Sequence, residues 1–183
     1  MSLKTNIWLV LYYGFAQWLP GSNTRLGGLF CSKKIRYACC RHIFKSIGKD
    51  VNIERRAWFG CGGGVEIGDR SGIGYGAHIL NNSIIGKDVM MGPGLYMLEN
   101  THVHDRTDIP MMDQGMKATR DQVVIGDDVW IGKDVMIVGS RTIATGSIVA
   151  ARTLLVKSFP EYSIIGGNPS RLIKSRKEES NCI

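Results

Sequence analysis

The chain has 183 residues, of which 44% are hydrophobic and 21% are charged. This composition predicts one globular domain with its own core and argues against a disordered chain. The formal net charge is +7, but the basic residues concentrate in 33–56 and 171–177 and lack the interleaved aromatic residues that stack on nucleic-acid bases. We therefore expect no nucleic-acid partner. A polyanionic small ligand or an acidic membrane surface explains the charge more simply.

Residues 1–46 are mostly apolar and basic, and we expect them to form a helical N-terminal cap. Their apolar run, Ile7–Leu19, is shorter than the roughly 20 residues that span a bilayer, so it does not predict a transmembrane helix. Two roles remain open for it. The run either packs across one end of the fold, or residues 7–19 anchor the protein peripherally at the inner membrane face, helped by the basic stretch that follows.

The cysteines and histidines argue against disulfides and metal sites. The five cysteines are an odd number without a repeated spacing, and the N-terminus lacks the pattern of a secretion signal. We therefore expect a cytoplasmic protein. Cys39 and Cys40 are adjacent, and the four histidines do not complete a zinc ligand set, so we expect no metal.

A six-residue repeat organises the middle of the chain. An aliphatic residue or methionine occupies every sixth position from Ile67 to Met97 and again from Ile125 to Leu155. A rougher series begins at Ile47 and slips by two residues before Ile67. A period of six fits neither a helix nor a plain alternating strand, so each hexad is expected to form one short strand and a turn. Three hexads then close a triangular coil, and successive coils stack.

We therefore predict an all-β fold, a single-stranded parallel β-helix over 47–160. The repeated aliphatic residue points into a narrow core, and the Gly, Asp or Asn that follows it is expected to adopt the backbone angles of the corner. Counting faces places 67, 85 and 125 on the same side of the coil. Segment 103–124 has no hexad pattern and should therefore protrude at a single corner, just after His102. Long excursions of this kind are usually functional.

The C-terminal part, 161–183, begins with a Gly-Gly-Asn-Pro turn. The apolar and basic stretch Arg171–Lys174 that follows predicts a short closing helix, and the last residues form a tail.

Three segments, THVHDRTDIPMMDQG, VVIGDDVWIGKDVMI and YSIIGGNPSRLIK, resemble in order and spacing the hexapeptide-repeat acetyltransferases. The likeness is to the branch of maltose and galactoside O-acetyltransferases and their polysaccharide-modifying relatives, and it covers roughly 47–176. It implies a left-handed coil, acetyl-CoA as co-substrate, and a homotrimer in which two neighbouring subunits share each site.

In that family a histidine just before the protruding loop accepts the proton of the acceptor hydroxyl as it attacks the thioester. His102 is the matching position and is the predicted catalytic residue. An imidazole with a pKa near 6.5 is the side chain best able to take up that proton at neutral pH. His104, two residues on, is interpreted as a loop packing residue.

The resemblance also predicts an acceptor site. Trp130 ends the first hexad after the loop, so we expect it on an outward corner. It matches a tryptophan that lines the acceptor pocket in the family. The family's asparagine is replaced by Gly72 or Gly74, so Asn81 and Asn82, about one coil below His102, are expected to substitute. Asn82 and Asn100 are the asparagines assigned to the acceptor site. Asp105 either contacts the sugar or the imidazole, or pairs within the loop to order it.

The positions that match the family's coenzyme A contacts lie after the loop. They are Lys133, Ala151, Arg152, Val156, Lys157, Arg171 and Lys174. Arg171 and Lys174 suit phosphate groups. Arg152 stands where the family has Gly, and Val156 where it has Thr.

Two further functions compete with transfer of acetyl to a polysaccharide or glycan-precursor sugar. The acceptor is otherwise a free oligosaccharide such as maltose or a galactoside, or the chain is a non-catalytic trimeric β-helix that only binds. A carbonic-anhydrase-type zinc site on the same fold is disfavoured, because the spacing of His78 and His102 is not a multiple of the coil.

Overall fold

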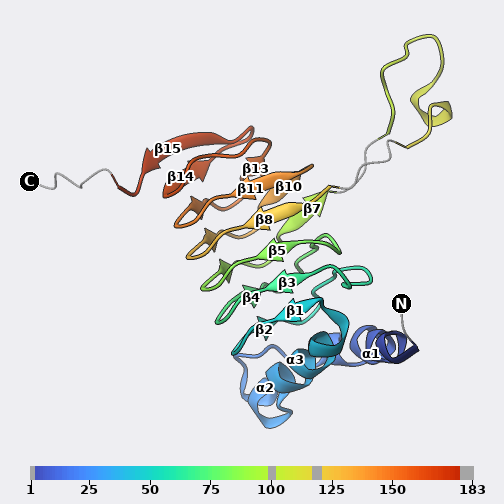
Figure 1. The fold of residues 1–183 in the computed structure, drawn as a ribbon, viewed down its shortest axis with the longest axis vertical. Helices are drawn as coiled ribbons and strands as arrows, with labels where there is room; N and C mark the ends of the chain where they lie inside the picture. The colour runs from blue at the N-terminus through green and yellow to red at the C-terminus, as the bar shows by residue number, and fades with distance from the viewer. Residues whose placement is uncertain (1–2, 99–101, 117–120, 178–183) are drawn as a thin grey trace, which may run out of the picture.

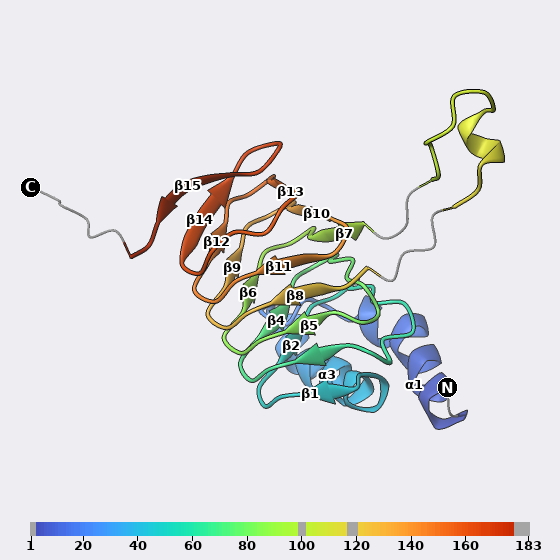
Figure 2. The same ribbon diagram turned by 45° about the horizontal axis from the view of Figure 1, so that its top comes forward.

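The computed structural model describes residues 3–98, 102–116 and 121–177. Its centre is a coil of short parallel strands arranged as three stacks, which we call faces one, two and three (Figures 1 and 2). Face one consists of β1 (Ser46–Ile47), β3 (Glu66–Ile67), β5 (Ile84–Ile85), β8 (Val123–Ile125) and β11 (Arg141–Ile143). Face two consists of β2 (Asn52–Ile53), β4 (Gly72–Ile73), β6 (Met90–Met91), β9 (Trp130–Ile131), β12 (Ile148–Val149) and β14 (Ser163–Gly166). Face three consists of β7 (Tyr96–Leu98), β10 (Met136–Val138) and β13 (Leu154–Leu155).

The strand register confirms the hexad repeat. Ile67 pairs with Ile85, and Ile125 with Ile143, so each of these coils advances by 18 residues. The first coil is longer by two, because Ile47 pairs with Ile67, which is the slip that the sequence predicts. The repeated aliphatic side chains point inward and are buried, and their removal from water is the main force that holds a narrow coil together.

The role that we predicted for the glycine after each aliphatic residue is wrong. The residues that turn the corner with positive φ stand three positions after the aliphatic, as Asp88 does at φ 60° and Asp128 at φ 53°. Gly86, directly after Ile85, is needed for a different reason. A Cβ built there would lie 2.7 Å from the carbonyl carbon of Gly126 in the next coil. These glycines therefore allow the coils to stack closely.

The insertion leaves the coil intact. Ile85 and Ile125 are direct partners although 39 residues lie between them (125 − 85 − 1). The chain leaves at the end of β7 on face three and returns in β8 on face one, as the face count predicts. Residues 102–116 protrude from this corner and include the short helix η2 (Met111–Asp113) (Figure 1).

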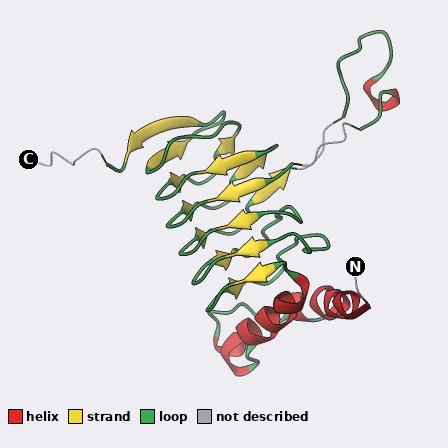
Figure 3. Ribbon diagram, viewed as in Figure 1, coloured by secondary structure: helices red, strands yellow, loops and turns green. Residues whose placement is uncertain are grey.

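Helices form the N-terminal cap: α1 (Leu3–Gly14), η1 (Ala16–Trp18), α2 (Arg25–Leu29) and α3 (Ser32–Ile43). They lie at one end of the coil, as Figure 3 shows in red. The Thr24 side chain caps α2 by accepting a hydrogen bond from Gly27 N at 2.9 Å. α3 buries Cys40 and Ile43 against the first coil, and Tyr12 of α1 donates a hydrogen bond to Ala57 O.

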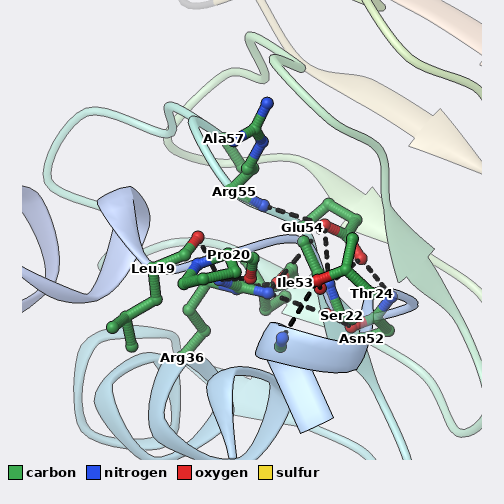
Figure 4. A network of polar contacts seen from close by, with 12 residues as sticks. Leu19, Pro20, Ser22, Thr24, Arg36, Asn52, Ile53, Glu54, Arg55 and Ala57 are labelled. Carbon is green, nitrogen blue, oxygen red and sulfur yellow. Dashed lines mark hydrogen bonds and ion pairs between the residues drawn. The ribbon is translucent and has the colours of Figure 1, made fainter. Parts of the chain in front are cut away.

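A buried arginine joins the cap to the coil (Figure 4). Arg36 of α3 donates from Nε to Ile53 O at 2.6 Å, from its other nitrogens to Leu19 O, Pro20 O and Ser22 Oγ, and lies 3.8 Å from a Glu54 carboxylate oxygen. Burial lowers the pKa of Arg36, and the neighbouring Glu54 opposes that shift. The guanidinium thus satisfies two backbone carbonyls of the linker between η1 and α2 and one carbonyl of β2.

The predicted C-terminal helix is wrong. Residues Arg171–Ser175 form strand β15, which pairs antiparallel with β14. The turn between them contains the cis Asn168–Pro169 peptide bond. Tertiary pairing decides the outcome here, because the free edge of β14 offers hydrogen-bond partners that a five-residue isolated helix lacks.

Candidate active site

His102 lies at the base of the protruding loop. It forms an isolated antiparallel bridge with Met116, and Val103 N donates to Gly115 O at 3.0 Å. The two ends of the described part of the loop are therefore joined to each other. The His102 side chain is exposed, so a substrate in solvent can reach its imidazole.

The loop is ordered by its own polar contacts. Gln114 Nε2 donates to Arg106 O at 2.8 Å and to Ile109 O at 3.1 Å, while Gln114 Oε1 accepts from Arg106 N. The Arg106 guanidinium pairs with Asp108. Asp105 instead lies 3.8 Å from His104 Nδ1 and is exposed. Among the described loop residues, Arg106 thus pairs with Asp108, and Asp105 lies against His104.

Asn82 lies on the same corner as the loop. Gln122, where the chain returns from the loop, donates from Nε2 to Asn82 O at 3.0 Å. Beside it, Asp121 Oδ1 accepts hydrogen bonds from the backbone and hydroxyl of Ser140. Asn82 therefore lies beside the point where the chain re-enters the coil after the loop. Asn100 lies outside the described residues.

Trp130 does not lie on a corner, as we had placed it. It is an outward residue of β9, in the middle of face two between Met90 and Ile148, and its side chain is 52% exposed. Face two is opposite the corner that carries His102. One chain alone therefore does not bring Trp130 and His102 into the same pocket.

The predicted coenzyme A positions fall into three groups, and all but the half-buried Val156 are exposed. Lys133, Ala151 and Arg152 occupy the corner between faces two and three, where Arg152 N donates to Lys133 O. Val156 and Lys157 follow β13 and lie on the corner between faces three and one. Arg171 and Lys174 are on β15 beside face two, opposite Gly166 and Ile164.

A hollow that the sequence analysis missed lies between the cap and the corner of faces two and three. Its polar lining includes Asn52, Glu54, Arg55 and Tyr75. The Arg55 guanidinium lies 4.9 Å from the centre of the Tyr75 ring. Burial raises the pKa of Glu54, but hydrogen bonds from Ser22, Arg55 and Asn52 outweigh it and leave the pKa lowered. The sequence does contain a signal for this hollow. Because the first coil has 20 residues, residue 55 stacks on residue 75 of the following coil.

His78 has a structural environment on face three. Its ring lies between those of Trp58 and Tyr96, at centroid distances of 4.0 and 4.4 Å. Burial lowers the pKa of His78. Over 3–98, 102–116 and 121–177, no three metal-binding side chains gather in one place.

No family model matches the chain. A probable acetyltransferase of Mycobacterium tuberculosis is 30% identical over 118 residues, which are 63% of this chain and 38% of that protein. A putative lipopolysaccharide biosynthesis O-acetyl transferase of Escherichia coli is 26% identical over 106 residues, 55% of this chain and 54% of that protein. The chain thus spans about a third to a half of the length of these two relatives.

Solved structures agree with the sequence relatives. A hexapeptide-repeat acetyltransferase of Vibrio cholerae in complex with acetyl-CoA superposes with a TM-score of 0.70 at 29% identity, covering 78% of this chain and 77% of that one. A maltose O-acetyltransferase of Clostridium difficile superposes with a TM-score of 0.73 at 26% identity, covering 94% and 86%. The chain is therefore similar to the hexapeptide-repeat acetyltransferases in sequence and structure, which confirms the resemblance stated from its motifs.

Proposed function

We propose that this chain is an acetyl-CoA-dependent O-acetyltransferase that acetylates a sugar hydroxyl of a surface polysaccharide or glycan precursor. The observation that carries the proposal is the exposed His102, which lies at the base of the excursion from a coil similar to that of acetyltransferases. The proposal includes a left-handed coil, by likeness to the same structures. It also includes a cytoplasmic location, which the odd number of cysteines and their lack of a repeated spacing support.

In the proposed reaction His102 acts as general base. Its imidazole accepts the hydroxyl proton while the sugar oxygen bonds to the acetyl carbonyl carbon. The carbon–sulfur bond of the thioester then breaks, and the proton passes to the departing thiolate, so that the imidazole is neutral again. Side-chain access supports this role, because both substrates must reach one nitrogen atom from solvent.

A threefold assembly explains why the predicted cofactor positions lie on two corners. Within one chain, face three separates Lys133, Ala151 and Arg152 from Val156 and Lys157. The two groups can border one elongated cofactor if two neighbouring chains bring these corners together. The corner between faces three and one of one chain would then lie beside the corner between faces two and three of its neighbour. In a closed ring of three this arrangement packs face one against face two.

The outward side chains of faces one and two support this packing. Ile84 and Val124 on face one and Met90, Trp130 and Ile148 on face two are apolar and lie in register. The same arrangement sets the hollow containing Arg55 and Tyr75 near the neighbour's His102 corner, where it can receive the acceptor.

The catalytic proposal is tested with His102→Ala and the matched control His104→Gln. Thiol release from acetyl-CoA is followed in the presence of surface-glycan sugars, maltose and galactosides. We expect His102→Ala to lower the rate by about 10²–10⁴-fold and His104→Gln to keep most of it. Full activity of His102→Ala would refute the role of His102. Binding of coenzyme A without turnover of any sugar would favour a non-catalytic protein.

The assembly is tested by sedimentation of two outward substitutions. Val124→Arg on face one should shift the trimer to monomer, whereas Met136→Arg on face three should leave it unchanged. The opposite result would mean that face three forms the interface.

A further inference from the structure

The outer side of the N-terminal cap is an exposed apolar surface. On α1, Ile7, Val10 and Leu11 recur at helical spacing and point to solvent, with Val10 72% exposed. Phe15 and Trp18 continue the stripe and line one hollow together with Phe30. We name the whole set the cap surface; it comprises Ile7, Val10, Leu11, Phe15, Trp18, Leu26, Leu29 and Phe30.

The cap surface is not needed to attach the helices to the coil. The opposite side of α1 makes that contact: Tyr12 is fully buried, and Tyr13 donates to Gly60 O at 2.9 Å. Trp8 packs within the cap, where its ring stacks on His42 of α3 at 4.3 Å. α1 is therefore apolar on both sides, and one side has no partner within the described chain. Contiguous exposed apolar surface of this kind marks an interaction site.

The charges around the cap surface indicate the kind of partner. Residues 1–49 contain no Asp or Glu and eight basic residues: Lys4, Arg25, Lys33, Lys34, Arg36, Arg41, Lys45 and Lys49. Among the described residues, ion pairs of this segment are those of Lys33 with Asp50, Arg36 with Glu54 and Lys45 with Glu66. Arg25 and Lys34 are exposed and flank Leu26, Leu29 and Phe30 along the chain. An apolar surface bordered by cations complements the anionic headgroups and acyl chains of a membrane.

We propose that the cap surface binds peripherally to membranes that contain anionic lipids. Phe15, Trp18 and the aliphatic side chains enter the interface, while Arg25, Lys34 and Lys4 lie at headgroup level. None of the helices within the described residues is long and apolar enough to cross a bilayer, so the contact is made along the membrane plane. The inference depends on the cap alone and does not require the proposed transferase activity.

The experiment measures sedimentation of the full chain with vesicles of phosphatidylcholine alone and of phosphatidylcholine mixed with phosphatidylglycerol. We expect binding to the mixed vesicles that falls as salt is raised. Val10→Glu combined with Leu29→Glu should reduce binding at least tenfold. The control Met112→Glu makes the same kind of change on the protruding loop, far from α1 in Figure 1, and should bind like the parent.

A second variant separates binding from folding. Arg25→Gln combined with Lys34→Gln changes exposed cations only and should weaken binding to the mixed vesicles at least threefold. The inference is overturned if the parent binds neither vesicle, or if both double variants bind as it does. It is also overturned if the parent self-associates through the cap, seen as a smaller particle for Val10→Glu with Leu29→Glu in the absence of lipid.

Discussion

Gly86→Ala tests the account of how the coils stack. The new methyl group would meet three atoms of the next coil: Asp127 Oδ1 at 2.5 Å and the carbonyl carbon and oxygen of Gly126 at 2.7 Å. Two of these atoms belong to the backbone. The backbone of the next coil cannot move away without lengthening the hydrogen bonds between coils, such as that from Gly86 N to Ile125 O at 2.8 Å. Overpacking of this kind costs about 1–3 kcal/mol, and we expect the upper end.

Gly72→Ala is the matched control, because its methyl group would meet only Asn52 O at 3.6 Å. We expect this substitution to be neutral, or to stabilise the fold by about 0.4–1 kcal/mol because it lowers the conformational entropy of the unfolded chain. Thermal unfolding at equal protein concentration should show Gly86→Ala about 6–16 °C below Gly72→Ala, because the expected difference of about 3–4 kcal/mol corresponds to roughly 2–4 °C per kcal/mol. Equal melting temperatures would refute close coil stacking as the reason for glycine at position 86.

Two further predictions concern buried groups. Arg36→Met should destabilise the fold by about 3–5 kcal/mol in urea unfolding, because it removes the ion pair with Glu54 and leaves three backbone carbonyls without the guanidinium. Arg41→Met, on the exposed side of the same helix, should stay within about 0.5 kcal/mol. Burial lowers the pKa of His78 below 6.5, so the imidazole binds a proton more readily in the unfolded chain than in the folded one. The free energy of unfolding should therefore fall as the pH drops below 6.5, and it should fall less in His78→Gln. An NMR titration of the His78 ring that gives an ordinary midpoint would contradict this.

The sequence predicts the core well because the hexad period is a property of the chain itself. Register follows from it: the pairing of Ile85 with Ile125 across the loop could be deduced by counting. The function of Gly86 could not, since it depends on the distance between coils. Strand β15 was missed for a similar reason, because only the edge of β14 distinguishes a strand from a helix in Arg171–Ser175.

The candidate site divides in the same way. His102 and Asn82 were predictable, since both follow from their positions relative to one corner. Trp130 was placed on a corner because it ends a hexad, but the hexad boundary falls within strand β9, where its side chain points outward from face two. Arg55 was missed because its partner Tyr75 belongs to the following coil.

The two ends of the coil also bear on whether the protein forms fibres. A stack of parallel strands could lengthen indefinitely, because its first and last rungs would each accept another molecule. Here the helices occupy one terminus, and at the other the antiparallel β15 reverses the strand direction and carries Arg171 and Lys174. Both features oppose head-to-tail polymerisation through face two and favour association through the sides of the molecule.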